Sequence, residues 1–311
     1  MKKMLALLLA LVMVLSLAAC ASSQPAAAST ETAETTETTE PAAEESAEAP
    51  AESGKTYTVG VCQLVQHEAL DAATQGFVDA LKEELGDAVI VDVQNASGDS
   101  VNCGTIVNGF VSKGVDLIMA NATPALTAAV SATADIPILG TSITAYGVAL
   151  DIDDFNGTVG GNVSGTSDLA DLQAQAQMIL DWFPETKTVG LLFCSAEPNS
   201  RYQIDEVRKA LEAQGVTCEE FAFTDSNDVS SVTQKAADFS DVVYIPTDNT
   251  AASNTEAIAN VLIPAGVPAI CGEEGLCRGC GVATLSISYY DLGVTTGKMA
   301  AKILKGEADI S

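Results

Sequence analysis

Eight cysteines and one histidine are the side chains of this 311-residue chain that most readily do chemistry. Cys277 and Cys280 form a C-x-x-C pair with Cys271 nearby, a pattern known from redox dithiols and zinc sites. A redox pair needs its first cysteine at a helix N-terminus, and zinc needs a fourth ligand; the sequence shows neither. We therefore expect buried or unpaired thiols first, a local disulfide second, and redox or metal chemistry third. The pairing of the cysteines is not fixed by the sequence.

The single histidine, His67, follows the first predicted strand. His67-Glu68 begins like a zinc-protease motif, but Asp71 stands where the second histidine belongs. His67 fits the rim of a cleft as a hydrogen-bonding residue, and it lacks a nucleophile at catalytic spacing. A surface position without function is the simplest interpretation. Because phosphate-binding glycine loops and G-x-S-x-G elbows are also absent from the sequence, it predicts no enzyme, no metal site and no cofactor.

The charge balance excludes two classes of partner. The chain has 42 acidic and 14 basic residues, which gives a formal net charge of −28. A nucleic-acid backbone must be met by clustered Lys and Arg, and anionic lipid attracts basic surfaces. We therefore expect neither nucleic-acid binding nor adsorption to a membrane by surface charge.

The first 54 residues predict export and a tether. Lys2 and Lys3 precede an apolar run that ends in Leu-Ala-Ala-Cys20. This end resembles the lipobox of bacterial lipoproteins, so residues 1–20 are interpreted as a lipoprotein signal peptide with Cys20 as the lipidated residue. An ordinary secretory signal with an incidental cysteine is the alternative. Residues 21–54 are rich in Ala, Ser, Thr and Glu and predict a disordered acidic tether.

The remaining chain predicts an α/β fold of two Rossmann-like lobes with parallel sheets joined by a hinge. Apolar strand patterns alternate with helical patterns, as in right-handed β-α-β units. The strands at 58–61, 115–119 and 136–139 are echoed at 188–191, 241–245 and 267–270. We place the N-terminal lobe at 55–165 and the C-terminal lobe at 166–288, with 147–168 as the crossing between them. A calcium loop at the crossing is the alternative, but Phe155 and Asn162 stand where ligands would be needed.

Polar residues follow the predicted strands, where ligands of open parallel sheets bind. Gln63 and Gln66 follow the first strand, and Thr141 and Ser142 the fourth. The hydroxyls and free backbone N–H groups there suit a carboxylate. Asp248 and Glu273, in the second half, suit an ammonium, so together the halves complement a zwitterionic amino acid. Helix capping accounts for about half of such residues without any ligand.

Several motifs resemble the substrate-binding lipoproteins of ABC importers in the tryptophan/tyrosine group. These motifs are Val61-Cys62-Gln63-Leu64-Val65-Gln66-His67, Ala122-Thr123-Pro124-Ala125, Pro246-Thr247-Asp248-Asn249-Thr250, Gly272-Glu273-Glu274-Gly275 and Tyr289-Tyr290-Asp291-Leu292-Gly293. The resemblance implies a type I periplasmic-binding-protein fold that closes on an aromatic amino acid. It implies ligand-binding roles for Gln63, Thr123, Ser167, Asp168, Asn199, Asp248, Asn249 and Glu273. We expect Asp248 to pair with the α-ammonium, and Thr123 and Asn199 to hold the carboxylate.

The resemblance also implies a monomer that is lipid-anchored on the extracytoplasmic face of the cell membrane and delivers its ligand to ABC permease and ATPase subunits. Family topology returns residues 289–311 to the first lobe, and relatives continue beyond Ser311, so we expect a truncated C-terminus. Candidate aromatic walls for the ligand are Tyr146, Phe155, Tyr289 and Tyr290. The alternatives are an extracytoplasmic ligand sensor with the same fold and a thiol oxidoreductase that uses Cys277 and Cys280.

Overall fold

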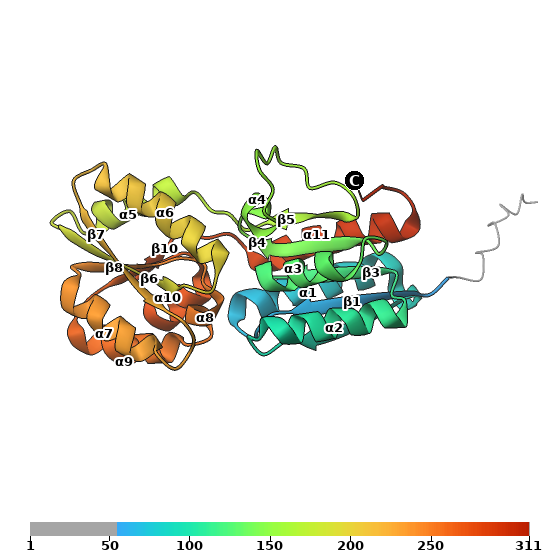
Figure 1. Cartoon of the computed structure of the whole chain (residues 1–311), viewed down its shortest axis with the longest axis horizontal. Coiled ribbons are helices and arrows are strands. Elements are labelled where there is room, and N and C mark those ends of the chain that lie inside the picture. Colours follow the sequence, from blue (N-terminus) through green and yellow to red (C-terminus); the bar gives the residue numbers. More distant parts are fainter. Residues whose placement is uncertain (1–54, 311) are drawn as a thin grey trace, which may run out of the picture. The chain divides into compact units, whose positions relative to one another are not determined.

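The computed structural model describes residues 55–310 and contains two lobes, each built on a five-stranded parallel sheet (Figure 1). The strand orders are β2-β1-β3-β4-β5 in the first lobe and β10-β9-β8-β6-β7 in the second. The predicted pair of Rossmann-like lobes is therefore confirmed. Cys20, the signal peptide and the tether lie outside the described residues.

The three predicted strands of the first lobe lie close to their expected ranges, and its elements are as follows. They are β1 (Tyr57–Gln63), α1 (Glu68–Leu85), the 3-10 turn η1 (Gly86–Ala88), β2 (Val89–Asn95), α2 (Ser100–Lys113), β3 (Leu117–Asn121), α3 (Thr123–Ala132), β4 (Ile138–Ile143), α4 (Tyr146–Ala149) and β5 (Val163–Ser167). Both β3 and β4 are buried along their whole length, which explains why they read as continuous apolar runs rather than alternating ones.

The second lobe repeats the alternation. Its elements are α5 (Leu172–Trp182), β6 (Thr188–Cys194), α6 (Pro198–Glu212), β7 (Thr217–Phe223), α7 (Val229–Phe239), β8 (Val242–Ile245), α8 (Asn249–Ala252), α9 (Thr255–Ala265), β9 (Ala269–Cys271), α10 (Glu274–Cys280) and β10 (Ala283–Thr284). The C-x-x-C pair lies on the short helix α10, with Cys280 as its last residue.

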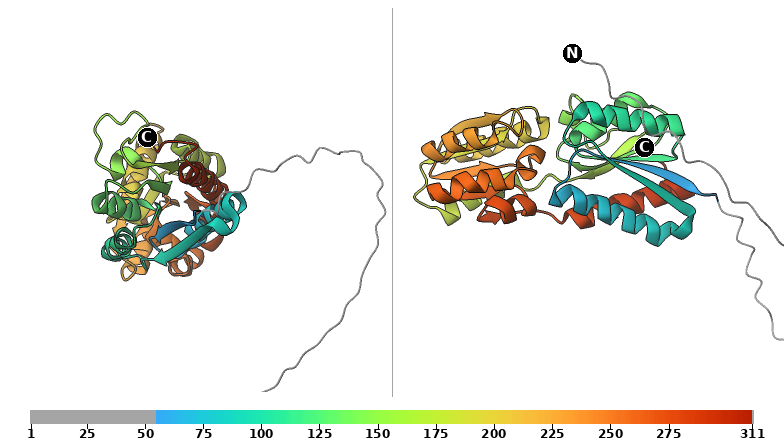
Figure 2. Two further views of the ribbon diagram at one scale, coloured as in Figure 1. Left: turned by 90° about the vertical axis from the view of Figure 1, so that its right-hand side faces the viewer. Right: turned by 90° about the horizontal axis from the view of Figure 1, so that it is seen from below.

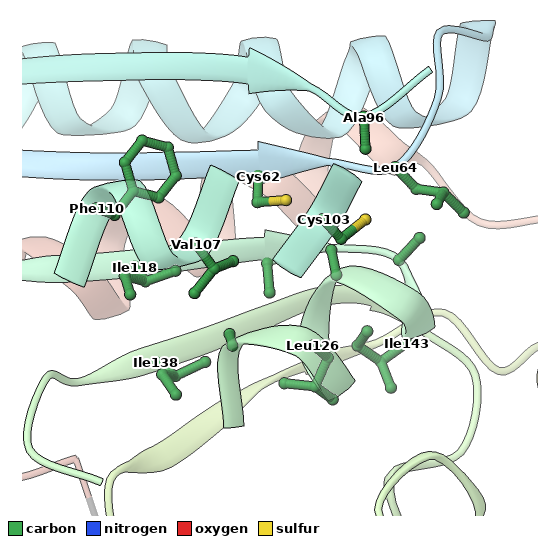
Figure 3. Packing of buried hydrophobic residues seen from close by; sticks show 14 of the residues in the cluster. Cys62, Leu64, Ala96, Cys103, Val107, Phe110, Ile118, Leu126, Ile138 and Ile143 are labelled. Atoms are coloured by element: carbon green, nitrogen blue, oxygen red, sulfur yellow. The ribbon is translucent and has the colours of Figure 1, made fainter. Parts of the chain in front are cut away.

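Helices cover both faces of the first sheet (Figure 2). In β1, Val59 and Val61 pack with α1 and α11, whereas Cys62 packs with α2 on the other face. This alternation follows from the two-residue period of a strand. Figure 3 shows the α2 side, where the buried Cys62 and Cys103 lie among aliphatic side chains and Phe110. The seven cysteines within residues 55–310 are free thiols.

The last helix, α11 (Tyr289–Lys305), packs against α1 and contacts β4 and β5 of the first sheet. Glycines permit the close approach of the two helices. A Cβ atom on Gly293 would lie 2.0 Å from the Ala73 carbonyl oxygen, and one on Gly76 would lie 2.1 Å from the Tyr290 carbonyl oxygen. The chain therefore crosses between the lobes twice, once after β5 and once before α11.

The segment interpreted as the first crossing differs from that interpretation, because residues 163–167 form β5 and pair with β4. The strand escapes periodicity because it reads Val-Ser-Gly-Thr-Ser, without an apolar run. Gly165 lies at φ +146°, where a Cβ atom would lie 2.2 Å from the Gly140 carbonyl oxygen, so this register needs glycine. Within residues 55–310, no helix is long and apolar enough to cross a membrane.

Candidate functional site

A small cavity lies between the two lobes, at the carboxyl ends of their strands. Its lining comes from both lobes and consists of His67, Ala69, Leu70, Ser142, Thr144, Asp168, Asn199, Thr247, Asp248, Asn249, Ala252, Glu273 and Tyr289. Its volume of about 10 Å³ holds no more than one water molecule. Five residues expected to bind the ligand lie here: Asp168, Asn199, Asp248, Asn249 and Glu273.

The structure places the other three expected residues outside this lining. The Gln63 amide bonds within the first lobe, donating to Asp71 at 2.6 Å and accepting from Thr74 at 2.6 Å. Thr123 begins α3 and lines a separate hollow. The Ser167 hydroxyl donates to the Thr144 carbonyl at 3.1 Å, and its residue borders a third hollow.

Asp248 is fully engaged with its own lobe. Its Oδ1 accepts from the Ala251 backbone N–H at 2.8 Å, which caps α8. Its Oδ2 accepts from the Cys194 backbone N–H at 2.6 Å and from the Ser200 hydroxyl at 2.8 Å. Burial and the neighbouring charge of Glu197 raise the pKa of Asp248 to about 8. This carboxyl therefore braces the ends of two strands, β6 and β8, and both of its oxygens already accept from the protein.

Glu197, which the sequence analysis did not single out, organises the loop that carries Asn249. One carboxylate oxygen accepts from the Asn249 backbone N–H at 3.0 Å and from its Nδ2 at 2.7 Å. The other accepts from the backbone N–H and the hydroxyl of Thr250, both at 2.8 Å. The buried Glu197 side chain precedes Pro198 at the start of α6. The sequence marks Glu197 as the residue before a helix, but it does not show that its carboxylate bonds to a residue 52 positions away.

Glu273 caps α10 in the same manner. Its carboxylate accepts from the backbone N–H groups of Gly275 at 2.6 Å and Leu276 at 2.5 Å. Burial raises its pKa. Capping thus explains Glu273 and Asp248 as structural carboxylates at the edge of the cavity.

Asp168 differs from both, because one of its oxygens keeps acceptor capacity. Its Oδ2 accepts from the Tyr289 hydroxyl at 2.8 Å. Its Oδ1 is buried with no hydrogen bond of ordinary length to the described residues, although the nearby Thr144 hydroxyl opposes the rise in pKa that burial causes. Burial raises the pKa of Asp168, since the ionised form loses its hydration. Asp168 and Tyr289 sit at the two crossings between the lobes.

Three further buried polar atoms around the cavity lack a partner. They are His67 Nδ1, Ser142 Oγ and Asn199 Oδ1. Native proteins rarely leave buried polar atoms unpaired, so the partners of these four atoms must come from water or from a bound molecule. His67 is therefore a cavity residue rather than the surface residue that was the simplest interpretation of the sequence.

Ser142 reaches the cavity through an unusual backbone. Its φ is +56°, a left-handed conformation at the irregularity between β4 and β5. Strained residues of this kind gather at functional sites. The sequence placed Ser142 after the fourth strand but gave no sign of its conformation.

The thiol alternative finds no support in the geometry. Cys277 and Cys280 pack beside the buried Cys271 and do not line the cavity. Burial raises the pKa of Cys277, whereas a redox nucleophile needs a lowered one. Among residues 55–310, no group of three or more His, Cys, Asp or Glu is arranged to hold a metal ion.

Of the four candidate aromatic walls, only Tyr289 lines the cavity. Tyr146 is buried and bonds to the Gly140 and Thr166 carbonyls at 3.1 Å. Phe155 and Tyr290 are partly exposed, at 37% and 42%.

Comparison with known proteins adds sequence and structural relatives. The family model described as ABC transporter substrate binding protein matches residues 58–310. A tyrosine-binding protein of Clostridioides difficile (strain R20291) is 32% identical over 263 residues, which cover 83% of this chain and 75% of that protein. An ABC domain of Streptococcus pneumoniae in complex with L-Trp has 34% identity and a TM-score of 0.78, with 81% of this chain and 86% of that chain covered. The predicted type I periplasmic-binding-protein fold is confirmed.

A second solved relative helps to interpret the small cavity. The ligand-free, open structure of a Clostridium difficile substrate-binding protein with adhesive properties has 35% identity and a TM-score of 0.59, again over 81% of this chain and 86% of that chain. The lower TM-score at nearly equal identity means that this structure resembles the tryptophan complex more than the open structure. The small cavity fits that resemblance, because lobes that have approached one another leave little room between them.

Proposed function

Because this chain belongs to the family of ABC transporter substrate-binding proteins, we propose that it binds an aromatic amino acid between its lobes and delivers it to an ABC importer. The observation that carries this proposal is the set of four buried, unpartnered polar atoms around one cavity, contributed by both lobes. The family is one of binding proteins, so the importer supplies the permease and ATPase subunits and this chain makes or breaks no covalent bond.

We assign the α-ammonium of the ligand to Asp168 rather than to Asp248. Asp168 Oδ1 is a buried acceptor without a partner, whereas both Asp248 oxygens already accept protein donors. An ammonium beside Asp168 would also favour its ionised form and offset the raised pKa. The Asp168 carboxylate is held in place by the Tyr289 hydroxyl.

Asn199 supports the ammonium side of the ligand and not the carboxylate side. Its Nδ2 donates to Glu197 Oε2 at 3.2 Å and to the Thr247 carbonyl at 3.1 Å. Both partners are acceptors, so the orientation of the amide is fixed and Oδ1 is the atom without a partner. Ser142 is left as the hydroxyl donor for the ligand carboxylate.

The aromatic class rests on the relatives and on the shape of the lining. One relative is named a tyrosine-binding protein and another was solved with L-Trp. Tyr289, Leu70 and Ala252 supply apolar surface beside the polar atoms. An amino acid exceeds the volume present, so it enters when the lobes are apart, and the lobes of the complex stand further apart than in this structure. Its contacts to both lobes favour the state that closes around it.

We further propose that Cys20 is diacylated and anchors the monomeric protein to the outer face of the cell membrane. Substrate-binding proteins of this family act outside the cytoplasm, and the apolar run before Cys20 supports the anchor. Cys20→Ala expressed in bacteria should move the protein from the membrane fraction to the soluble fraction. Retention of Cys20→Ala in the membrane fraction would exclude this anchor.

Isothermal titration calorimetry of the full-length chain with each of the twenty amino acids tests the ligand proposal. We expect binding of tryptophan, tyrosine or both, and a loss of at least about tenfold in affinity for Asp168→Asn, because a charged hydrogen bond is lost. Thermal unfolding of the variant controls for folding. Heat from none of the twenty would refute the proposed function.

A further inference from the structure

We propose that His67 selects the ligand by its side chain: His67 Nδ1 accepts a hydrogen bond, so the site favours amino acids whose side chain carries an N–H or O–H donor. This inference rests on the proposed function and refines its ligand class. It predicts that tyrosine and tryptophan bind well and that phenylalanine, of nearly the same shape as tyrosine, binds poorly.

The side-chain amide of Asn249, which contacts His67 from the other lobe, has a fixed orientation. Asn249 Nδ2 donates to Glu197 Oε2 at 2.7 Å. A carboxylate oxygen only accepts hydrogen bonds, and this one also accepts from the Asn249 backbone N–H at 3.0 Å. The NH2 end of the Asn249 amide therefore faces Glu197. Asn249 therefore turns its carbonyl oxygen, Oδ1, toward His67.

The contact with Asn249 determines the tautomer of His67. His67 Nε2 lies 3.2 Å from Asn249 Oδ1, and an acceptor on that side requires a proton on Nε2. Burial lowers the pKa of His67 and outweighs the opposing effects of Asn249, Glu197 and Asp71. The imidazole is therefore neutral near pH 7, and a neutral imidazole with its proton on Nε2 has an unprotonated Nδ1 that only accepts.

His67 Nδ1 is buried and has no hydrogen-bond partner among residues 55–310. A donor must come from the guest. The α-ammonium is one donor, but Asp168 is the carboxylate that attracts it. His67 precedes α1 in the first lobe and Asp168 follows β5 at the crossing, so the two acceptors come from separate segments of the lining. With the ammonium on Asp168, the donor left for His67 Nδ1 is one carried by the ligand side chain.

The site should therefore discriminate against a ligand whose side chain cannot donate a hydrogen bond to His67. Tyrosine offers a phenol O–H and tryptophan an indole N–H, whereas phenylalanine would leave Nδ1 buried and unpaired. An unsatisfied buried acceptor weakens binding by about 10- to 100-fold. Sites built around a hydrogen bond reject the analogue that lacks the group far better than apolar pockets reject a small size difference.

Matched ligand pairs on the unmodified full-length chain give the first test. Calorimetry compares tyrosine with phenylalanine, and tryptophan with its benzothienyl analogue, in which sulfur replaces the indole N–H. We expect the donor-bearing member of each pair to bind about tenfold tighter or more. Equal affinity within both pairs would overturn the role of His67 while leaving amino-acid binding intact. Binding of no amino acid would refute the proposed function itself, and the role of His67 with it.

Two substitutions of His67 separate its two nitrogens. His67→Asn keeps an acceptor near the position of Nδ1 but cannot reach Asn249, and His67→Gln keeps a donor toward Asn249 but removes the acceptor. The Gln carbonyl oxygen is an acceptor but does not stand at the position of Nδ1. We expect His67→Asn to retain the preference for tyrosine over phenylalanine, and His67→Gln to reduce it to about threefold or less. If His67→Gln weakens all ligands by one common factor, His67 acts on the shared backbone of the ligand and the proposal is wrong.

Discussion

Glu68 of the first lobe forms an ion pair with Arg278 of the second, although 210 positions separate them in the chain. The two side chains are exposed by 48% and 64%, so the pair lies at the mouth of the hollow next to the cavity. Glu68 begins α1 and Arg278 lies on α10, so the contact exists only when the lobes are close together.

This ion pair predicts that closure depends on salt. Glu68→Gln should weaken amino-acid binding by up to about fivefold at low salt and remove part of the salt dependence, because an exposed pair contributes little and is screened. Calorimetry at low and high salt measures both effects. The matched control is Glu84→Gln, which breaks a pair with Lys305 inside the first lobe at 3.0 Å. Equal behaviour of the two variants would show that the Glu68 pair has no part in closure.

A larger side chain at Gly275 should also affect the closure of the two lobes. A Cβ atom there would lie 3.0 Å from Glu68 Cβ and 3.1 Å from Glu273 Oε2. Gly275→Val should hold the lobes apart and weaken ligand binding by about tenfold or more, because its nearest contact, with Glu68, lies between the lobes.

The control for Gly275→Val is Gly104→Ala in α2. A Cβ atom on Gly104 meets nothing within 4 Å, and alanine favours a helix. Gly104→Ala should leave affinity unchanged. Undiminished affinity of Gly275→Val would argue against the closed arrangement described here.

The stability of the protein should fall as the pH rises from about 6.5 to 7.5. The folded-state pKa of Asp248 is raised to about 8, so its carboxyl holds a proton in the folded chain and loses it on unfolding. The unfolded state therefore binds fewer protons, and each such group lowers the free energy of unfolding by up to about 1.4 kcal/mol per pH unit. The raised pKa values of Asp168 and Glu273 act in the same direction.

Urea unfolding across this pH range measures the slope. The window avoids the opposite effect of His67, whose lowered pKa makes stability rise with pH only below about 6.5. Asp248→Asn should give a flatter dependence. A free energy of unfolding that rises with pH across the window would contradict the protonated state of Asp248.

Much of this fold could be predicted from the sequence, because most of the buried strands are marked by a local apolar run. The runs at 58–61 and 188–191 lie in β1 and β6, which occupy corresponding positions in the two sheets. The strand β5 was missed, since a polar strand that pairs through Gly165 leaves no apolar pattern.

The location of the candidate site could be predicted from the sequence, but the roles of its individual residues could not. Asp248 and Glu273 stand at the expected strand ends, but their capping bonds and the engagement of Asp248 with Cys194 depend on geometry. The unpaired state of Asp168 Oδ1 and His67 Nδ1 likewise follows from what surrounds them in space. A residue's type shows which bonds it can make, and the fold decides which of them are already made.

The cysteines should be dispensable for ligand binding. The double substitution Cys277→Ser and Cys280→Ser changes thiols that pack beside Cys271, away from the cavity. We expect amino-acid affinity to change by no more than about twofold, since no cavity contact is altered. A large loss of affinity in a folded double variant would show that these two thiols contribute to function.

The most direct test of the account is a crystal structure of the full-length chain with bound tyrosine. We predict that the ligand lies between the lobes, that its ammonium contacts Asp168 Oδ1, and that its phenol O–H faces His67 Nδ1. A tyrosine bound outside this cavity, or one whose ammonium contacts Asp248 instead, would contradict it.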